Sequence, residues 1–278
     1  MNMAIKLKTG VDVRRLVRAG EFTGQTAGQA PDHLQGNVVI LPRAYASDFL
    51  QYCLNNPKPC PLIGLSKPGD PAVPALGENI DIRFDVPRYR VYRNGLLDDE
   101  TTSVETLWRD DLVSFVLGCS FTFEDALIRA GFGVRHIEAG QNVPMFRSSI
   151  QTLAGGIFKG PLVVTMRPYP EDRIPDVFDI CAQYPQAHGT PVHWGDPAAI
   201  GIADLDAPDY GDPVEVRDDE IPVFWACGVT PQAAIEAARP SLTITHAPGH
   251  MLVTDIPADR SLQTITGMKN FRTQTVET

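Results

Sequence analysis

The sequence predicts an α/β protein built from two domains. Residues 222–245 alternate strand, helix and strand, which is the rhythm of an α/β layer. Residues 119–212 differ in texture, because Gly, Pro and Asp become frequent toward the end of that stretch. A chain of 278 residues suits one large domain or two of ordinary size. We expect a larger, discontinuous domain of residues 1–118 and 213–278, with residues 119–212 forming a smaller α+β domain inserted into it.

Apolar spacing and turn residues predict the elements in chain order. Tyr45, Phe49 and Tyr52 recur at helical spacing, and Pro57 lies just beyond the end of that helix. The apolar run 108–117 is buried, but its periodicity fits a strand or a helix equally. The helix that contains Tyr45 is expected over 43–54, after the apolar residues 38–41 that begin the compact part of the chain. The other expectations are helices over 12–18, 124–130, 175–183 and 231–238, and strands over 61–65, 89–91, 161–166, 222–226 and 242–245.

Composition and charge exclude several classes of function. The chain carries 24 Lys and Arg against 34 Asp and Glu, a net charge of −10, and no basic cluster stands out. Sequence-independent binding to nucleic acid or to an acidic membrane is therefore disfavoured. No apolar run is long enough to cross a membrane, and we expect no secretory signal. We expect a cytoplasmic protein with a small-molecule substrate and no nucleic-acid or membrane partner, and homo-oligomerisation stays open.

Cysteine usage agrees with a reducing compartment. The five cysteines are odd in number and widely spaced, and none forms a Cys-x-x-Cys pair. This pattern argues against a disulfide framework and against a cysteine-rich zinc site.

Two of the cysteines lie in turns that match each other. Cys119 and Cys227 each follow an apolar run, each has Thr three residues later, and each leads into a predicted helix. Thr230 is predicted to cap its helix, and Thr122 is predicted to form a capping box with Asp125. Unpaired N–H groups and the helix macrodipole favour a thiolate at such a position, so we expect lowered thiol pKa values. If the turns face each other, they place two acid/base groups around one small acid; otherwise the cysteines simply pack beneath two helices.

Two polar loops contain most of the histidines. His246 and His250 follow the last predicted strand, but a Pro-Gly pair between them prevents a shared helical face. An acid/base or hydrogen-bonding role is therefore favoured over metal ligation, and we predict no metal site. The loop 188–197 contains His188 and His193 among glycines and prolines, and it is either a site loop or a rigid structural loop.

Candidates for substrate binding are fewer. Arg147 is suited to hold a carboxylate in a bidentate pair, and Asn142 adds an amide nearby. Asp255 is placed to orient a histidine, and Glu124 is an alternative base, although a carboxylate in a first helical turn is also expected for structural reasons. The sequence lacks a P-loop, a nucleophile elbow and a dinucleotide fingerprint, so nucleotide cofactors and serine hydrolase chemistry have no support.

Together these motifs resemble the bacterial "putative hydro-lyase" family, the YcsI-like group related to D-glutamate cyclase. The resemblance extends from about Leu41 to Ile256, and Trp194 stands where a smaller aliphatic residue is expected. It implies a three-layer α/β/α domain with a smaller two-layer α+β domain, and carbon–oxygen lyase chemistry. The most specific activity implied is interconversion of D-glutamate with 5-oxo-D-proline and water. The stretches that carry it are 118–124, 142–145, 188–197, 224–231 and 245–255.

This reaction needs a base, an acid, donors for an oxyanion and a carboxylate anchor, and it requires no organic cofactor. Backbone N–H groups near the two cysteines are candidate oxyanion donors. The catalytic candidates are Cys119, Cys227, His246, His250 and Glu124, and the substrate-binding candidates are Arg147, Asn142, His193, Thr230 and Asp255.

Three other functions stay open. Opposed cysteines could exchange an α-proton in a racemase or epimerase. A metal-dependent hydratase could use His193, His246 and His250 with Asp residues. A non-catalytic protein could bind a small acid without turnover.

Overall fold

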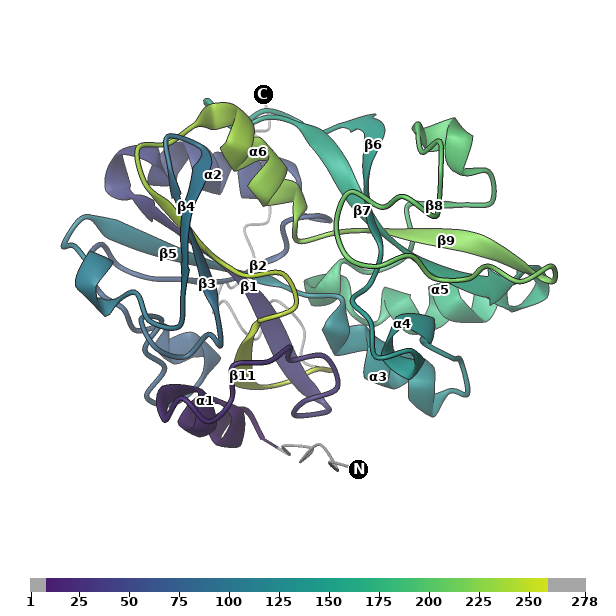
Figure 1. The fold of residues 1–278 in the computed structure, drawn as a ribbon, viewed down its shortest axis with the longest axis horizontal. Helices are drawn as coiled ribbons and strands as arrows, with labels where there is room; N and C mark the ends of the chain where they lie inside the picture. Colours follow the sequence, from purple (N-terminus) through teal and green to yellow (C-terminus); the bar gives the residue numbers. More distant parts are fainter. Residues whose placement is uncertain (1–8, 260–278) are drawn as a thin grey trace, which may run out of the picture.

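The protein has two lobes, each built on an antiparallel sheet, in a computed structural model that describes residues 9–259 (Figure 1). The larger lobe holds a seven-stranded sheet in the order β2-β5-β1-β10-β3-β4, with β11 paired to β1. Its strands are β1 (His33–Pro42), β2 (Leu62–Leu65), β3 (Tyr89–Arg93), β4 (Leu96–Thr101), β5 (Leu112–Gly118), β10 (Thr243–His246) and β11 (Leu252–Pro257).

The smaller lobe holds a four-stranded sheet in the order β6-β7-β9-β8. Its strands are β6 (Met145–Gln151), β7 (Pro161–Pro170), β8 (His193–Trp194) and β9 (Glu220–Ala226). The α-helices are α1 (Gly10–Arg18), α2 (Arg43–Asn55), α3 (Phe121–Arg129), α4 (Arg135–Glu138), α5 (Ile174–Ala182) and α6 (Thr230–Ala238). Short 3-10 turns are η1 (Pro74–Leu76), η2 (Glu105–Leu107), η3 (Glu171–Arg173), η4 (Pro185–Ala187) and η5 (Pro197–Ile200).

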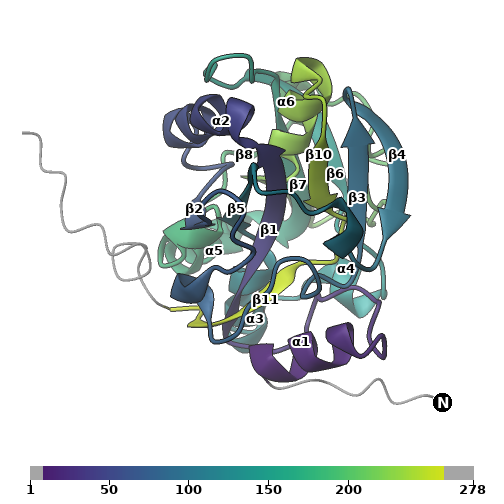
Figure 2. The ribbon, with the colours of Figure 1, turned by 90° about the vertical axis from the view of Figure 1, so that its left-hand side faces the viewer.

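The core of the larger lobe is organised around β1, which is buried along nearly its whole length. This strand lies between β5 and β10, and α2 packs against it, while α1 lies beside β11 (Figure 2). Phe49 of α2 meets Phe115 of β5 edge to face, with ring centroids 4.9 Å apart. The aromatic side chains of α2, which recur at helical spacing, therefore face this sheet and cover it.

The core of the smaller lobe lies between its sheet and the helices α3 and α5 (Figure 1). Phe123 of α3 packs on Trp225 of β9, with ring centroids 5.7 Å apart, and Val177 of α5 belongs to the same cluster. These are the side chains that the apolar spacing of each element directs inward.

The chain crosses between the lobes at the ends of two strands. After β5 of the larger sheet it enters α3, which places Phe123 in the core of the smaller lobe. After β9 of the smaller sheet it enters α6, which adds Ile235 to the core that α2 shares with β1 and β5. Cys119 and Cys227 are the first residues of these two crossings, so the fold brings both to the junction of the lobes.

The predicted α/β character is confirmed, and most predicted elements are present. The ambiguous run 108–117 ends in the strand β5. The domain boundary expected at residue 213 is wrong in one respect, because β9 pairs with β7 and belongs to the smaller sheet. By sheet membership the smaller lobe therefore extends to Ala226, beyond the expected end at residue 212. Within residues 9–259, no helix has the length and apolar character needed to span a bilayer.

Candidate active site

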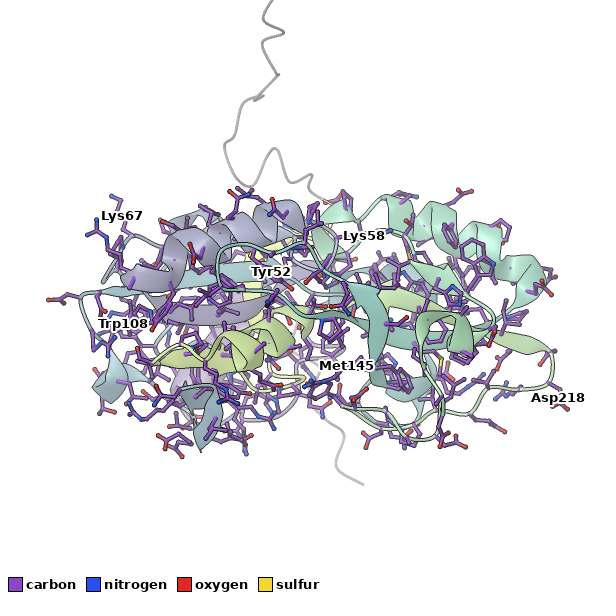
Figure 3. The ribbon with its side chains drawn as sticks, turned by 90° about the horizontal axis from the view of Figure 1, so that it is seen from above. Tyr52, Lys58, Lys67, Trp108, Met145 and Asp218 are labelled. Atoms are coloured by element: carbon purple, nitrogen blue, oxygen red, sulfur yellow. The ribbon has the colours of Figure 1, made fainter. Side chains whose placement is uncertain are left out.

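A cavity lies at the junction of the two lobes. Met145, one of its lining residues, is seen near the middle of the long axis, between the lobes (Figure 3). Asn142 and Pro248 are half-buried, whereas the other lining residues are buried, and we therefore take these two residues to mark the mouth of the cavity. The polar lining consists of two thiols, two imidazoles, two hydroxyls and two amides, from Cys119, Cys227, His188, His246, Ser120, Thr165, Asn37 and Asn142.

The first cysteine turn is fastened to β1 by two hydrogen bonds. The backbone N–H of Cys119 donates to the carbonyl oxygen of Gln35, at 3.0 Å. The backbone N–H of Gln35 donates in return to the hydroxyl of Thr122, at 3.1 Å. The cysteine N–H and the threonine hydroxyl thus both bond to one residue of the neighbouring strand. We call this pair of hydrogen bonds a clamp.

The second cysteine turn repeats this clamp on β7. The N–H of Cys227 donates to the carbonyl oxygen of Val163 at 3.0 Å, and the N–H of Val163 donates to the hydroxyl of Thr230 at 3.1 Å. The Thr230 hydroxyl also donates to the carbonyl oxygen of Val163, at 3.2 Å. The sequence match between the turns is therefore a match in structure, and both thiols line the same cavity and belong to one apolar cluster.

Neither threonine caps a helix, contrary to the sequence-based prediction. α3 begins at Phe121 and α6 begins at Thr230 itself, and neither helix has a side-chain cap. The hydroxyls are instead used in the clamps, which require the threonines to face the adjacent strand. Thr230, predicted to bind substrate, does not line the cavity.

The thiols are protonated at neutral pH. Burial raises the pKa of Cys119 to about 12 and that of Cys227 to about 11. Backbone N–H groups act in the opposite direction, and that of Val229 donates to the Cys227 sulfur at 3.4 Å. The expectation of lowered thiol pKa values is therefore wrong, because desolvation outweighs the N–H groups of the helix N-termini.

Each lobe also contributes one neutral histidine. Nδ1 of His188 lies 2.9 Å from the carbonyl oxygen of Lys58 and must donate to it, which leaves Nε2 unprotonated. Nδ1 of His246 lies 3.2 Å from the backbone nitrogen and 3.3 Å from the carbonyl oxygen of Val38, while its Nε2 is buried without a partner among the described residues. Burial lowers the pKa of both imidazoles to about 4.

Behind the cavity lies a buried ion pair. Nε of Arg167 lies 3.2 Å from Oε1 of Glu124, and His136 lies 3.3 Å from the same oxygen. Burial alone would raise the pKa of Glu124, but His136 and Arg167 outweigh it and lower that pKa. Glu124 does not line the cavity, so its expected role as an alternative base has no geometric support.

Two predicted histidine candidates lie outside the cavity lining. His250 is half-buried near the mouth, with Nδ1 2.8 Å from the carbonyl oxygen of Pro248. His193 lies on β8, with Nε2 2.7 Å from the carbonyl oxygen of Asp196. Residues 9–259 contain no cluster of three or more His, Cys, Asp or Glu side chains placed to hold a metal ion.

Two predicted charged candidates are also paired elsewhere. Arg147 forms a 2.7 Å ion pair with Glu236 and does not line the cavity. Asp255 forms a 2.8 Å ion pair with Arg14, at the far end of the larger lobe from α6 (Figure 1). The hypotheses that Arg147 anchors a carboxylate and that Asp255 orients a site histidine therefore find no support in their positions.

Sequence reasoning missed several lining residues. The sequence places His188 in a polar loop without indicating a catalytic role, and its motifs do not single out Ser120, Asn37 or Thr165. Asn37 and Thr165 are polar residues within apolar strands, and that departure from the strand pattern is the signal that could have found them.

Two thiols and two neutral imidazoles line one cavity, and groups of these types can act as acids and bases toward a small substrate. A comparison with protein families identifies the class, because the family described as D-glutamate cyclase matches residues 113–255. The chain therefore belongs to the D-glutamate cyclase family and is an enzyme of the carbon–oxygen lyase class, as the resemblance in the sequence predicts.

Curated relatives match over most of the chain. A protein from Bordetella petrii is 58% identical over 248 residues, which cover 89% of this chain and 94% of the relative. A protein from a Jannaschia species is 58% identical and covers 89% of this chain and 93% of its own. A protein from Dinoroseobacter shibae is 51% identical and covers 98% of this chain and 90% of its own. All three carry the name "Putative hydro-lyase".

Proposed function

We propose that this protein is a cofactor-free hydro-lyase that interconverts D-glutamate with 5-oxo-D-proline and water. The observation that carries the proposal is the meeting of Cys119 and Cys227 in one cavity with His188 and His246. Family membership supports the reaction class. The substrate and its chirality are the finer part of the proposal and need a direct assay.

Ring closure must move two protons from nitrogen to oxygen. The amine nitrogen of glutamate forms a bond to its own γ-carboxyl carbon, and one carbon–oxygen bond breaks. Starting from the ammonium form, two N–H protons are lost, and both end on the departing oxygen, which leaves as water. A site for this reaction needs a base near the nitrogen, an acid near the oxygen and donors for the tetrahedral oxyanion.

The cavity supplies groups in the right protonation states. Nε2 of His188 is the candidate acceptor for a proton of the amine, because the burial that lowers the pKa of this imidazole to about 4 keeps it unprotonated at neutral pH. Cys119 and Cys227 start as thiols and can protonate the departing oxygen. Nε2 of His246 has no protein partner among the described residues and is available to a substrate atom. In the hydrolytic direction each group performs the reverse transfer.

Substrate entry requires opening of the junction. The free interior of the cavity is about 20 Å³, whereas a single water needs roughly 10–15 Å³. Glutamate is much larger than one or two waters. The mouth at Asn142 and Pro248 is the only half-buried part of the lining, so we expect it to widen when substrate binds.

Proton NMR in heavy water tests the proposal directly. Purified protein is incubated separately with D-glutamate, L-glutamate and the two enantiomers of 5-oxoproline. We expect ring closure or opening with a preference for the D series. No conversion of any of the four would contradict the proposed reaction.

A second candidate function is favoured by the matched thiols. Two cysteines that meet around one cavity could remove and return an α-proton from opposite faces, as in a racemase or epimerase. The same NMR experiment separates the two functions, because racemisation places solvent deuterium at the α-carbon without forming or opening a ring. If only a rise in thermal stability is seen with these acids, the protein binds them without turnover.

A further inference from the structure

A pair of buried hydroxyls in the cavity is backed by a buried arginine. Arg167 is 1% exposed, Ser120 is 4% exposed and Thr165 is 1% exposed. Nη1 of Arg167 donates to the hydroxyl oxygen of Thr165 at 3.0 Å, and Nη2 donates to that of Ser120 at 3.1 Å. Ser120 and Thr165 both line the cavity, whereas Arg167 does not. The guanidinium therefore lies one layer behind the cavity wall.

The cation is held rigidly in this layer. Arg167 forms an ion pair with Glu124. Its guanidinium carbon also lies 5.2 Å from the ring centre of Phe123 and 5.2 Å from that of Trp225. Glu124 also takes no part in the cavity wall. The ion pair is neutral overall, but its positive member is the one that contacts the wall hydroxyls, so the electrostatic potential at those hydroxyls favours an anion.

The hydrogen-bond chemistry of the hydroxyls points the same way. A hydroxyl that accepts from a guanidinium still has one proton to donate. No acceptor for the protons of Ser120 and Thr165 is found within residues 9–259. Each of these two lining residues therefore has a hydroxyl that is polarised by the same cation and whose proton has no protein acceptor among the described residues. A ligand or water that accepts from such a donor recovers a hydrogen bond that the buried group otherwise lacks.

We propose that Ser120 and Thr165 form a carboxylate subsite. Arg167 is its positioning residue, because it orients the two hydroxyls and makes the electrostatic potential there favour an anion. The inference rests on the proposed function only in taking the ligand to be a small carboxylic acid. Ser120 directly follows Cys119, so a carboxylate bound here keeps the rest of the substrate beside the first thiol and within the cavity that it shares with Cys227. The subsite takes over the anchoring role that the sequence analysis gave to Arg147.

The test compares ligands and variants that differ by one group. The ligands are 5-oxo-D-proline, its carboxylate-free analogue 2-pyrrolidinone, D-glutamate and succinate. The variants are Thr165→Val and Ser120→Ala in the full chain. The matched controls are Thr243→Val and Ser114→Ala, because the hydroxyls of Thr243 and Ser114 are also buried but lie outside the cavity and have no hydrogen-bond partner within residues 9–259. Binding is measured by calorimetry and by thermal stabilisation, and KM and kcat are measured for any substrate that turns over.

We expect each site variant to weaken 5-oxo-D-proline binding about tenfold or more, because each removes a hydrogen bond to a charged group. Binding of 2-pyrrolidinone and the behaviour of both controls should be unchanged. KM should rise by more than kcat falls. A change in folding alone would affect the two ligands equally, so the difference between them is the informative readout.

The outcomes for the subsite and for the proposed reaction are separable. If no ligand turns over but the carboxylates bind and lose affinity in Thr165→Val, the proposed reaction is wrong and the subsite is supported. If turnover occurs and neither site variant changes KM or carboxylate affinity, the subsite is wrong and the reaction is supported. If no carboxylate binds the wild-type protein, or if 2-pyrrolidinone binds as tightly as 5-oxo-D-proline, the subsite is overturned.

Discussion

The two cysteine turns share one construction but differ in their surroundings. Each begins where a strand ends, and each is held by a cysteine N–H and a threonine hydroxyl that bracket one residue of the neighbouring strand. The turn at Cys119 continues into Ser120, which contacts the buried Arg167. The turn at Cys227 continues into Gly228, which has no side chain and lies against Asn37.

The difference gives the two thiols different chemical surroundings within one cavity. The shared clamp fixes the position of both thiols. The charged surroundings of the Cys119 turn suit the binding of a carboxylate, whereas the glycine of the Cys227 turn permits close approach of backbone and of Asn37. A repeated local structure can thus hold two similar groups in place, while the residues next to each group determine what can bind beside it.

Removal of either thiol should produce the largest effect and tests whether both turns are needed. We expect Cys119→Ala and Cys227→Ala each to lower kcat/KM by about 10²–10⁴-fold, the usual contribution of a general acid or base. Cys181→Ala is the matched control, because Cys181 is equally buried but belongs to the core of the smaller lobe. Full activity in either site variant would break the symmetry on which the comparison rests.

Acid should destabilise the protein through the histidine that each lobe contributes. The pKa of His188 and of His246 is about 4 in the folded state against 6.5 for a free imidazole. Between these values the unfolded chain binds more protons, so the free energy of unfolding falls as the pH falls through this window. The loss is about 3 kcal/mol for each histidine by pH 4.

Denaturant unfolding between pH 7 and pH 4.5 measures this effect. The slope of the free energy of unfolding against pH should decrease in His188→Gln and in His246→Gln. It should decrease most in the double variant. An unchanged slope in the double variant would show that these imidazoles do not drive the acid sensitivity.

Substitution of the glycine beside each cysteine should affect stability in one turn and activity in the other. A Cβ on Gly118 would lie 1.6 Å from the backbone oxygen of Gln186, whereas one on Gly228 would lie 2.2 Å from the side-chain nitrogen of Asn37. Because backbone yields less than a side chain, we expect Gly118→Ala to cost about 3 kcal/mol of stability, and Gly228→Ala to cost less but to lower kcat/KM by displacing Asn37. Thermal melts and kinetics on both variants check this, and equal losses of stability would contradict it.

The clamp threonines should give the smallest effect. Thr122→Val and Thr230→Val each leave a buried N–H without its acceptor, at a cost of about 1–2 kcal/mol. The loss should be greater for Thr230, whose hydroxyl both accepts from and donates to Val163. Thr243→Val should be nearly neutral, because the Thr243 hydroxyl is buried without a partner among the described residues. If all three variants have the same stability, the clamps do not stabilise the turns.

Local sequence patterns predicted much of the fold but not its sheet membership. Apolar spacing predicts α2, because one face of that helix is buried, and a β-branched apolar run predicts β7, which is buried along nearly its whole length. These patterns missed β4, Leu96–Thr101, an edge strand with mostly exposed residues and no alternation. The pairing of β9 with β7 depends on contacts between distant segments, which periodicity does not contain.

The candidate site was predictable to the same limited extent. The cysteine turns were found because the repeated motif is local, and the structure places both thiols in one cavity. The pKa direction of those thiols was wrong because burial is a tertiary property. Residue type alone favoured Arg147 as the carboxylate anchor, and only the folded structure shows that Arg167 contacts hydroxyls in the wall of the cavity.

A crystal structure with 5-oxo-D-proline bound would test most directly the claim that the two turns form one site. The account predicts a ligand ring between Cys119 and Cys227, with its carboxylate on the hydroxyls of Ser120 and Thr165. A ligand bound elsewhere, or in contact with only one of the two thiols, would contradict it.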